Sequence, residues 1–328
     1  MAKASNRIDG LRLRHLRVLE LIDEHRSLRA VGQVLNRTQP AVSQMVKDLE
    51  YAFGVELVAR SVRGVGLTPA GHVALERARS GLSSLDQLAA ELKISPSPIL
   101  RIGTNPALIF NLLPATLRIL DAGNNAVRYR VSAGVVGDIL RELWDGRIDC
   151  YVGRIDWNHI PKTVMPSLRH DPLTHTDLVL ACSKNHPLAG RSDIDIAELA
   201  DWPWLLPPAE SNNRIALETE LRNHGVILPQ PMLELNAGPG SLLTLTHEMQ
   251  VLTLTPRFML ESRLAVGEVV ALNIPGFALP EIQVGFVTLA EYETMASVRN
   301  FRQALRQAAE ALTGEYGRPC QLANSDPL

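Results

Sequence analysis

The 328-residue sequence has three cysteines, few aromatic residues and no long apolar run. Cys150, Cys182 and Cys320 lie far apart without paired metal-ligand spacing, so we expect reduced structural thiols and no metal site. A redox-sensing role for one of them is the alternative. No apolar stretch approaches the ~18–20 residues of a membrane span, and the N-terminus lacks a signal peptide. The sequence therefore predicts a cytoplasmic protein without a cofactor or a membrane contact.

Enzyme motifs are also lacking. His247-Glu248 has no second histidine at the spacing of a zinc-protease helix, and the nine histidines show no ligand spacing. Neither a phosphate-binding glycine motif nor a nucleophile-elbow serine occurs. We therefore predict no catalytic residue and a protein that is not an enzyme.

The formal net charge of -2 is unevenly distributed along the chain. Residues 1–68 contain eleven Lys or Arg and seven Asp or Glu, whereas the remainder contains 22 basic and 28 acidic residues. The basic end is the one expected to meet a polyanion, with binding that weakens as salt rises.

Residues 38–53 have the pattern of a helix that lies in a DNA groove. Thr38 suits an N-cap and Pro40 suits a first turn, so the helix is expected to begin near Gln39. One face is apolar: Val42, Met45, Leu49 and Phe53. The other face carries hydrogen-bonding groups, one cation and no acid: Gln39, Pro40, Ser43, Gln44 and Lys47. Gln and Ser can bind base edges and Lys neutralises phosphate, so this composition favours major-groove docking.

The neighbouring segments complete a helix-turn-helix. A helix is expected over residues 11–23, Ser27 caps a short helix over 28–35, and Asn36-Arg37 forms the turn. Gly54 is a C-cap glycine, and residues 55–67 predict a two-stranded wing with a basic tip. The residues predicted to contact DNA are Arg37, Thr38, Gln39, Pro40, Ser43, Gln44, Lys47, Arg60 and Arg63.

The run from Leu13 to Gly71 resembles the DNA-binding end of LysR-type transcriptional regulators. The motifs that carry the resemblance are Ser27-Leu28, Thr38-Gln39-Pro40-Ala41-Val42-Ser43, Leu49-Glu50, Gly54, Leu57 with Arg60, Arg63-Gly64 and Leu67-Thr68-Pro69-Ala70-Gly71. Four residues depart from the family pattern: Gly32, Val34, Arg37 and Val58. Gly32 costs about 1 kcal/mol relative to Ala inside a helix.

A long helix is expected over residues 69–93, followed by the stiff linker Ser95-Pro96-Ser97-Pro98. Its apolar residues follow the spacing of a heptad seam: Leu75, Ala78, Leu82, Leu85, Ala89 and Leu92. We interpret this stripe as a homodimer seam, because a dimer supplies the second recognition helix that a two-fold operator requires. Packing of the stripe against its own domain is the alternative. The family resemblance implies a dimer and often a tetramer.

Beyond Pro98, strands and helices alternate, which predicts parallel βαβ units in two similar α/β halves. The resemblance implies a two-lobed effector domain like a periplasmic binding protein, with crossovers near residues 170–172 and 273–275. The expected domains are a winged helix-turn-helix at 1–68, a linker helix at 69–97, an effector domain at 98–313 and a tail at 314–328. Lobe 1 comprises about 98–171 and 275–313, and lobe 2 about 172–274.

A ligand of such a domain is expected in the crevice at the carboxyl ends of the strands, where helix N-termini meet. The candidates from lobe 1 are Thr104, Asn105, Ser132, Ala133, Gly134, Gly153 and Arg154. Those from lobe 2 are Pro207, Pro208, Ala237, Gly238, Gly240 and Ser241. Helix-start amides and hydroxyls favour an anionic or polyhydroxylated molecule, and Arg154 can pair with a carboxylate. Taken singly, such serines and threonines are more often plain helix caps and such glycines plain turns, so the prediction depends on their convergence in the expected fold.

The sequence thus predicts a LysR-type transcriptional regulator controlled by a small-molecule effector. Its expected partners are a double-stranded DNA operator, the effector, a second copy of the chain and RNA polymerase. The alternative is a solute-binding module without a gene-regulatory role. The sequence leaves open the effector, the operator, the sign of regulation and the choice between dimer and tetramer.

Overall fold

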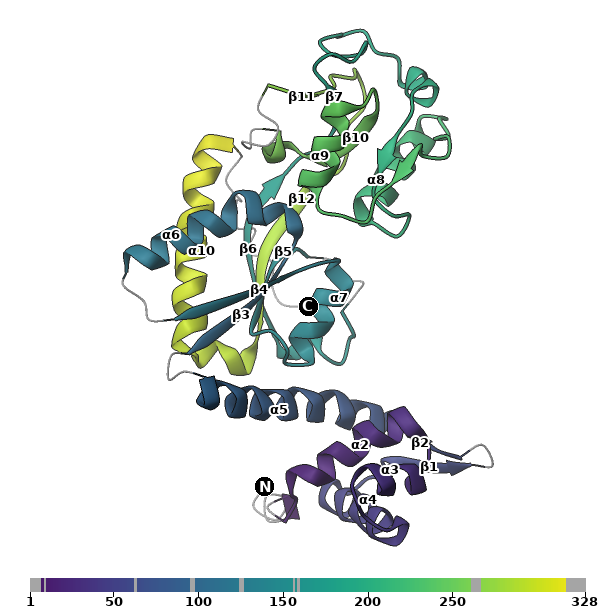
Figure 1. The fold of residues 1–328 in the computed structure, drawn as a ribbon, viewed down its shortest axis with the longest axis vertical. Helices are drawn as coiled ribbons and strands as arrows, with labels where there is room; N and C mark the ends of the chain where they lie inside the picture. Colours follow the sequence, from purple (N-terminus) through teal and green to yellow (C-terminus); the bar gives the residue numbers. More distant parts are fainter. Residues whose placement is uncertain are drawn as a thin grey trace.

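The structure is a computed structural model that describes residues 7–8, 10–61, 64–94, 98–123, 127–155, 157, 160–260 and 267–316. A small helical domain, a long helix and a two-lobed α/β domain follow one another along the longest axis (Figure 1). Within these described ranges, no helix is both long enough and apolar enough to cross a membrane.

The N-terminal domain contains three helices and a hairpin in its described part: α2 (Leu13–His25), α3 (Leu28–Val34), α4 (Gln39–Phe53), β1 (Val58–Ser61) and β2 (Gly64–Leu67). Its core brings together Val18 and Ile22 of α2, Val31 of α3, and Val42 and Met45 of α4. The apolar spacing read from the sequence therefore produces the predicted packing.

The turn between α3 and α4 explains one departure from the family pattern. A Cβ at Gly32 would lie 2.6 Å from the Arg37 carbonyl oxygen. The Arg37 amide donates to the Gly32 carbonyl at 2.8 Å. Glycine is therefore required by this close approach, although alanine is the better helix former.

Two local predictions for α4 are wrong. Thr38 occupies the N-cap position, but its side chain makes no capping hydrogen bond. Phe53, predicted on the buried face, is 43% exposed. It is the last helical residue before Gly54, where φ is +70° and the chain turns away from the core.

Helix α5 (Pro69–Ile94) packs along α2. Leu75, Ala78 and Leu82 are between 2% and 6% exposed and lie inside this chain, so they do not form an open dimer seam. Leu85 and Leu92 remain exposed. The first half of the predicted stripe is therefore buried against α2 of the same chain. For that half, the alternative of packing against its own domain replaces the homodimer seam.

Lobe 1 is built on a mixed sheet with the order β4-β3-β5-β12-β6 among the described residues. Its strands are β3 (Ile99–Thr104), β4 (Arg128–Ala133), β5 (Cys150–Arg154), β6 (Leu168–Thr176) and β12 (Ile282–Leu289). Its helices are η1 (Pro106–Phe110), α6 (Leu112–Ala122), α7 (Val136–Trp144), η3 (Met165–Ser167), η6 (Ala290–Thr294) and α10 (Ala296–Tyr316).

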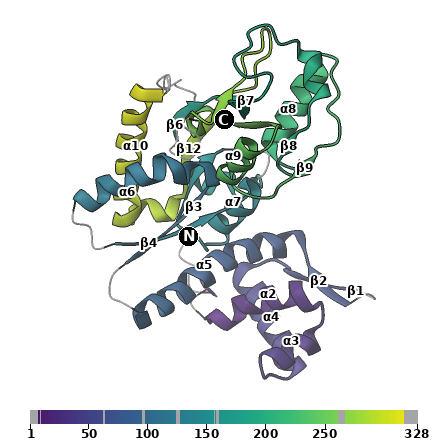
Figure 2. The same ribbon diagram turned by 45° about the horizontal axis from the view of Figure 1, so that its top comes forward.

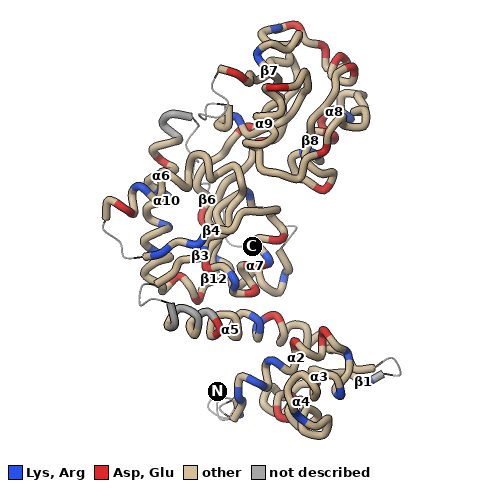
Figure 3. The backbone as a smooth tube through the Cα atoms, viewed as in Figure 1, with Lys and Arg blue, Asp and Glu red and all other residues tan. Residues whose placement is uncertain are grey.

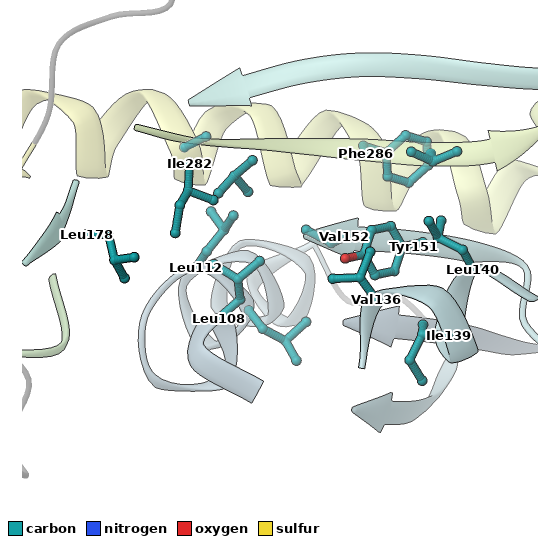
Figure 4. Close-up of a cluster of buried hydrophobic side chains, with 14 of the residues drawn as sticks. Leu108, Leu112, Val136, Ile139, Leu140, Tyr151, Val152, Leu178, Ile282 and Phe286 are labelled. Carbon is teal, nitrogen blue, oxygen red and sulfur yellow. The ribbon is translucent and has the colours of Figure 1, made fainter. Parts of the chain in front are cut away.

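The strands β3, β4 and β5 are parallel, and β12 is antiparallel to both β5 and β6. Helices α6 and α10 lie together on one side of the sheet and α7 lies on the other (Figures 1 and 2). Figure 4 shows the buried side chains of β5, α7 and β12, including Tyr151, Leu140 and Phe286, gathered in the core.

Lobe 2 contains β7 (Leu178–Ser183), β8 (Leu205–Leu206), β9 (Leu233–Glu234), β10 (Leu252–Pro256) and β11 (Val269–Ala271). Its helices are η4 (Ile196–Asp201), α8 (Asn212–Asn223), α9 (Pro239–Glu248) and η5 (Arg257–Met259). In the described part of lobe 2, the β10-β7-β11 sheet is antiparallel, whereas β8 and β9 pair in parallel and Trp204, just before β8, forms a parallel bridge with Leu252 of β10. The prediction of parallel units is therefore wrong for the pairing of β7 with β10 and β11, whereas β8 and its neighbours are parallel.

Two predicted boundaries shift. Residues 170–172 lie inside β6, which stays in the lobe 1 sheet as far as Thr176, so the chain enters lobe 2 later than expected. Helix α10 runs to Tyr316, past the predicted end of the effector domain at 313. Most of the predicted tail, residues 317–328 with Cys320, lies outside the described residues.

Candidate DNA interface and effector site

The polar face of α4 is open to solvent. Gln39, Pro40, Gln44 and Lys47 are exposed, as are Arg37 and Thr38 in the preceding turn. Gln44 Nε2 donates to Asp48 Oδ1 at 2.9 Å, so this glutamine already has an exposed partner that a base edge must replace. The arrangement suits a helix whose first turns enter a major groove.

The wing is fastened to the recognition helix. Glu50 Oε1 accepts from the backbone amides of Leu57 and Val58 at 3.0 and 3.1 Å. Arg60 Nη2 donates to Ser43 Oγ at 2.9 Å, which ties a predicted phosphate contact to a predicted base contact. Arg63, the other predicted wing contact, lies outside the described residues.

Two exposed arginines that the sequence pattern did not single out stand beside this face. The Arg26 carbonyl accepts from the Val65 amide at 3.1 Å, so Arg26 lies where the wing meets α2. Arg29 is exposed on α3. The basic excess of residues 1–68 includes both, but only the fold places Arg26 beside the wing.

Three acidic residues of this domain bond to partners within the protein. Asp23 Oδ2 accepts from Arg79 Nη2 at 3.1 Å, and Glu20 lies 4.0 Å from Arg79. Burial raises the pKa of Glu20. Glu50 holds the wing through two backbone amides. Figure 3 shows that Lys and Arg occur along α2 to α4 together with some Asp and Glu.

In the effector domain, the ends of β3, β4 and β5 come together. Thr104 pairs with Ala133 of β4 and with Val152 of β5 in the parallel sheet. Lobe 2 meets this edge at two points. A Cβ at Gly238 would lie 3.2 Å from Pro106 Cβ, and Arg154 Nη1 donates to Asn213 Oδ1 at 3.2 Å. The predicted crevice is thus bridged by side chains of both lobes.

A hydrogen-bond network fixes the backbone of Arg154. Asn105 Oδ1 accepts from the Arg154 amide at 2.7 Å and from Tyr151 Oη at 2.9 Å. Tyr151 Oη also lies 2.9 Å from the Arg154 carbonyl oxygen, so its single proton is shared between these two acceptors. Burial raises the pKa of Tyr151, so its phenol stays neutral. A Cβ at Gly153 would lie 1.9 Å from Asn105 Oδ1, so only glycine fits there.

Several predicted effector contacts are occupied by the protein itself. Thr104 is fully buried and its hydroxyl donates to the Val152 carbonyl at 2.9 Å, so the prediction of a ligand contact is wrong for Thr104. Gly153 is also buried. The Gly134 and Ser241 amides, predicted to be free helix-start donors, donate to the carbonyls of Thr104 and Gly238.

The remaining candidates differ in exposure. Ala133, Ala237 and Ser241 are exposed, whereas Gly240 is buried. The other members are half-buried: Asn105, Ser132, Arg154, Pro207, Pro208 and Gly238. Asn213 was not among the residues predicted from the sequence, and the structure places it in the first turn of α8, which begins at Asn212. The Asn212-Asn213 pair after Pro207-Pro208 is the signal in the sequence that could have indicated it.

A winged helix-turn-helix joined by a long helix to a two-lobed α/β domain defines a DNA-binding transcriptional regulator with an effector domain. Comparison with known families agrees. Residues 13–72 match the family described as bacterial regulatory helix-turn-helix protein, lysR family, and residues 93–310 match the LysR substrate binding domain. The chain belongs to the LysR family of transcriptional regulators.

Curated relatives include the HTH-type transcriptional regulator GbpR of Rhizobium radiobacter, 30% identical over 70% of this chain and 76% of that protein. The regulator TdcA of Escherichia coli K12 is 27% identical over 65% and 67%. Among solved structures, ArgP from Mycobacterium tuberculosis has a TM-score of 0.62 at 19% identity and covers 93% of this chain and 98% of that one. That likeness concerns the fold.

Proposed function

We propose that this regulator acts in the cytoplasm as a homodimer that sets two recognition helices on a two-fold operator. The exposed polar face of α4 carries the proposal. Gln39, Ser43 and Gln44 read bases, and Lys47, Arg37, Arg60 and Arg63 hold phosphates. Arg26 extends the phosphate contacts beside the wing, because it is exposed there and its carbonyl bonds to Val65. Arg29, exposed on α3, is a further candidate.

The proposed dimer contact is the uncovered side of α5. Leu85, Leu88 and Leu92 are 41%, 50% and 75% exposed and recur at helical spacing, with Gly81 one turn earlier. We call Leu85, Leu88 and Leu92 the leucine stripe. It keeps Leu85 and Leu92 of the predicted seam and adds Leu88, and Ala89 lies at its margin. Three large apolar side chains in water favour burial against a second copy.

The proposed effector is a small anionic or polyhydroxylated molecule that binds between the lobes. Arg154 supports this choice, because it lies at the edge where the lobes meet and its Nη1 donates to the neutral amide oxygen of Asn213. A carboxylate binds a guanidinium more strongly than an amide oxygen does. We infer that such a ligand takes over Arg154 from Asn213 and alters lobe closure, which changes the spacing or bend of bound DNA. RNA polymerase is the proposed downstream partner.

The first experiment is a genome-wide recovery of DNA fragments by the purified protein at two salt concentrations. We expect a two-fold symmetric site to be enriched, with recovery falling as salt rises. The matched control is the Gln39→Ala, Gln44→Ala double variant, which keeps the charge and loses the base-reading groups. Equal enrichment by the variant, or no enriched site at all, contradicts the proposed base contacts.

The dimer proposal has its own test in Leu88→Glu. A carboxylate within the leucine stripe is expected to shift the sedimentation mass toward the monomer and to weaken operator binding. Ile227→Glu is the control, because Ile227 is 83% exposed on lobe 2, far along the chain from α5. An unchanged sedimentation mass for Leu88→Glu would show that the leucine stripe is not the dimer contact.

A further inference from the structure

Tyr51 continues the exposed face of α4 beyond the predicted DNA contacts. It lies seven residues after Gln44 and four after Lys47, so the three side chains point to the same side of the helix. Tyr51 is 67% exposed, whereas Leu49 and Ala52 next to it are buried. A large aromatic ring therefore stands in solvent at the far end of the face proposed to meet DNA.

The chain before α2 places a cation over this ring. Arg7 Cζ lies 5.1 Å from the centroid of the Tyr51 ring, within the limit of about 6 Å for a cation–π contact. Arg7 is exposed, and among the described residues no carboxylate forms an ion pair with it. An aromatic face orients a guanidinium but leaves its N–H groups free to donate to an anion. Arg7 is thus positioned without being neutralised.

The Arg7–Tyr51 pair and the wing lie on opposite sides of α4. On one side, Glu50 holds the wing through two backbone amides. On the other side, Asp48 Oδ2 lies 3.8 Å from Nε2 of His15, in the first turn of α2. Arg7 precedes this turn, whereas the wing meets the C-terminal end of α2. Figures 1 and 2 show the start of the chain and the wing at opposite sides of the small domain.

The separation between these two sides suits a DNA groove. Helix α2, with 13 residues, is about 20 Å long at 1.5 Å per residue. The major groove is about 12 Å wide and admits one helix, with a phosphate backbone along each border. A recognition helix with a cation on each side can therefore reach both backbones. Arg60 of the wing is placed for one of them and Arg7 for the other.

The charge around the start of the chain also favours a polyanion. Residues 1–14 contain four Lys or Arg and one Asp. Asp48, the acid of α4 on this side, already accepts from Gln44 Nε2 and faces His15. Arg7 lies before residue 13, where the match to the helix-turn-helix family begins, so the cation comes from this chain's own N-terminal sequence.

We propose that the Arg7–Tyr51 pair is a second contact for the DNA backbone, on the side of the groove opposite the wing. Arg7 donates to a phosphate, and Tyr51 is the residue that positions Arg7. A phosphate contact carries no base information, so the pair increases affinity for any duplex and does not select a sequence. The inference rests on the proposed function, because the exposed face of α4 determines which side of the DNA the pair meets.

The test measures binding of the full chain to a labelled mixed-sequence DNA duplex over a series of salt concentrations. Arg7→Ala is expected to weaken binding about three- to tenfold at low salt and to reduce the salt slope by about one, because one phosphate contact is lost. Arg17→Ala is the matched control, since Arg17 is an exposed arginine of α2 that bonds to Asp86 of α5. Equal effects of the two variants would show net charge alone and overturn the proposal. An unchanged slope for Arg7→Ala overturns it as well.

Lys47→Ala, measured on the same duplex, separates this inference from the proposed function. If Lys47→Ala reduces the salt slope and Arg7→Ala does not, the α4 contact stands and the Arg7–Tyr51 contact is wrong. If Arg7→Ala reduces the slope and Lys47→Ala does not, the Arg7–Tyr51 contact stands and the proposed phosphate contact of α4 is wrong.

A second set of variants tests the positioning role of Tyr51. Tyr51→Phe keeps the ring and is expected to bind like the parent protein, whereas Tyr51→Leu is expected to weaken binding about two- to fivefold. In the Arg7→Ala background, Tyr51→Leu is expected to have no further effect, because the cation to be positioned is absent. Equal losses for Tyr51→Phe and Tyr51→Leu, or an undiminished loss for Tyr51→Leu without Arg7, would overturn the positioning role. Both side chains are exposed, so these substitutions leave the core intact.

Discussion

The DNA-binding domain and the effector domain present their polar groups differently. Between Arg37 and Lys47 the side chains chosen for contact stand in solvent within one short stretch of chain. At the lobe junction, the corresponding groups come from residues as distant as Asn105 and Asn213 and are bonded to one another through Arg154. The DNA surface gives up only exposed hydrogen bonds, those of Gln44 to Asp48 and of Ser43 to Arg60. The proposed effector would instead replace a hydrogen bond that joins the two lobes.

The largest expected effect separates the two regions by stability. Phe286 is 1% exposed in the lobe 1 core, so Phe286→Ala is expected to cost about 3–5 kcal/mol of unfolding free energy. Urea unfolding should show the effector-domain transition at lower denaturant, with the DNA-binding transition unmoved. Phe110→Ala is the control, since Phe110 is 39% exposed and the loss should be below about 1 kcal/mol. Equal displacement of all transitions means that the regions unfold as one unit.

The next effect concerns an ion-pair cluster in the effector domain. Asp171 accepts from Arg306 Nε and Nη2, both at 2.6 Å, and from Arg302 Nε at 2.9 Å. Burial alone would raise the pKa of Asp171, but these arginine hydrogen bonds outweigh it and hold the pKa below its usual value. The carboxylate therefore stabilises the fold above the unfolded pKa of about 3.9, and this contribution is lost as pH falls through the lower folded pKa.

Asp171→Asn is accordingly expected to cost about 2 kcal/mol at neutral pH and to flatten the fall in stability below about pH 4. Chemical denaturation of the effector domain across this pH range measures both effects. Asp193→Asn serves as the control, because the Asp193 side chain is 79% exposed in its pair with Arg191. A variant as acid-sensitive as the parent protein would show that Asp171 does not govern this part of the pH profile.

A smaller effect tests the open DNA surface. Gln44→Ala is expected to weaken binding to the recovered operator by about 1–2 kcal/mol and to spare non-cognate DNA. The lower part of the usual range applies because Gln44 gives up its hydrogen bond to Asp48 when it meets a base. Fluorescence anisotropy on both DNAs measures the difference. Equal loss of affinity for the two DNAs would show that Gln44 contacts only the DNA backbone.

The smallest effect is that of a phosphate contact. Lys47→Ala is expected to weaken binding to both DNAs by less than about 1 kcal/mol and to reduce the salt slope by about one. Salt titrations of the two complexes give this slope. Lys184→Ala on lobe 2 should leave the salt slope unchanged. An equal decrease in the slope for Lys184→Ala would show that the effect comes from the net charge of the protein and not from a contact made by α4.

The sequence predicted the elements of the DNA-binding domain more completely than those of the effector domain, for a physical reason. Helix caps, apolar spacing and the Gly54 stop are local signals, so α2 to α4 were foreseen within a few residues. Strand β6 was missed because it carries polar residues such as His170 and Asp171, which occupy an edge of the sheet and bond to α10. The antiparallel pairing of β7 with β10 was also missed, because hydrophobic runs do not record strand direction.

By itself, the sequence determined the winged helix-turn-helix, its polar recognition face, a long linker helix and an α/β effector domain. These follow from periodicity and turn chemistry over short stretches, and the family motifs agree with them. Tertiary structure alone decided which side of α5 is buried on α2 and which leucines stay exposed. It also decided that Thr104 is buried and that Arg154 reaches Asn213. Such choices depend on contacts between residues far apart in the chain, where packing and hydrogen-bond satisfaction select among faces that the local pattern leaves equivalent.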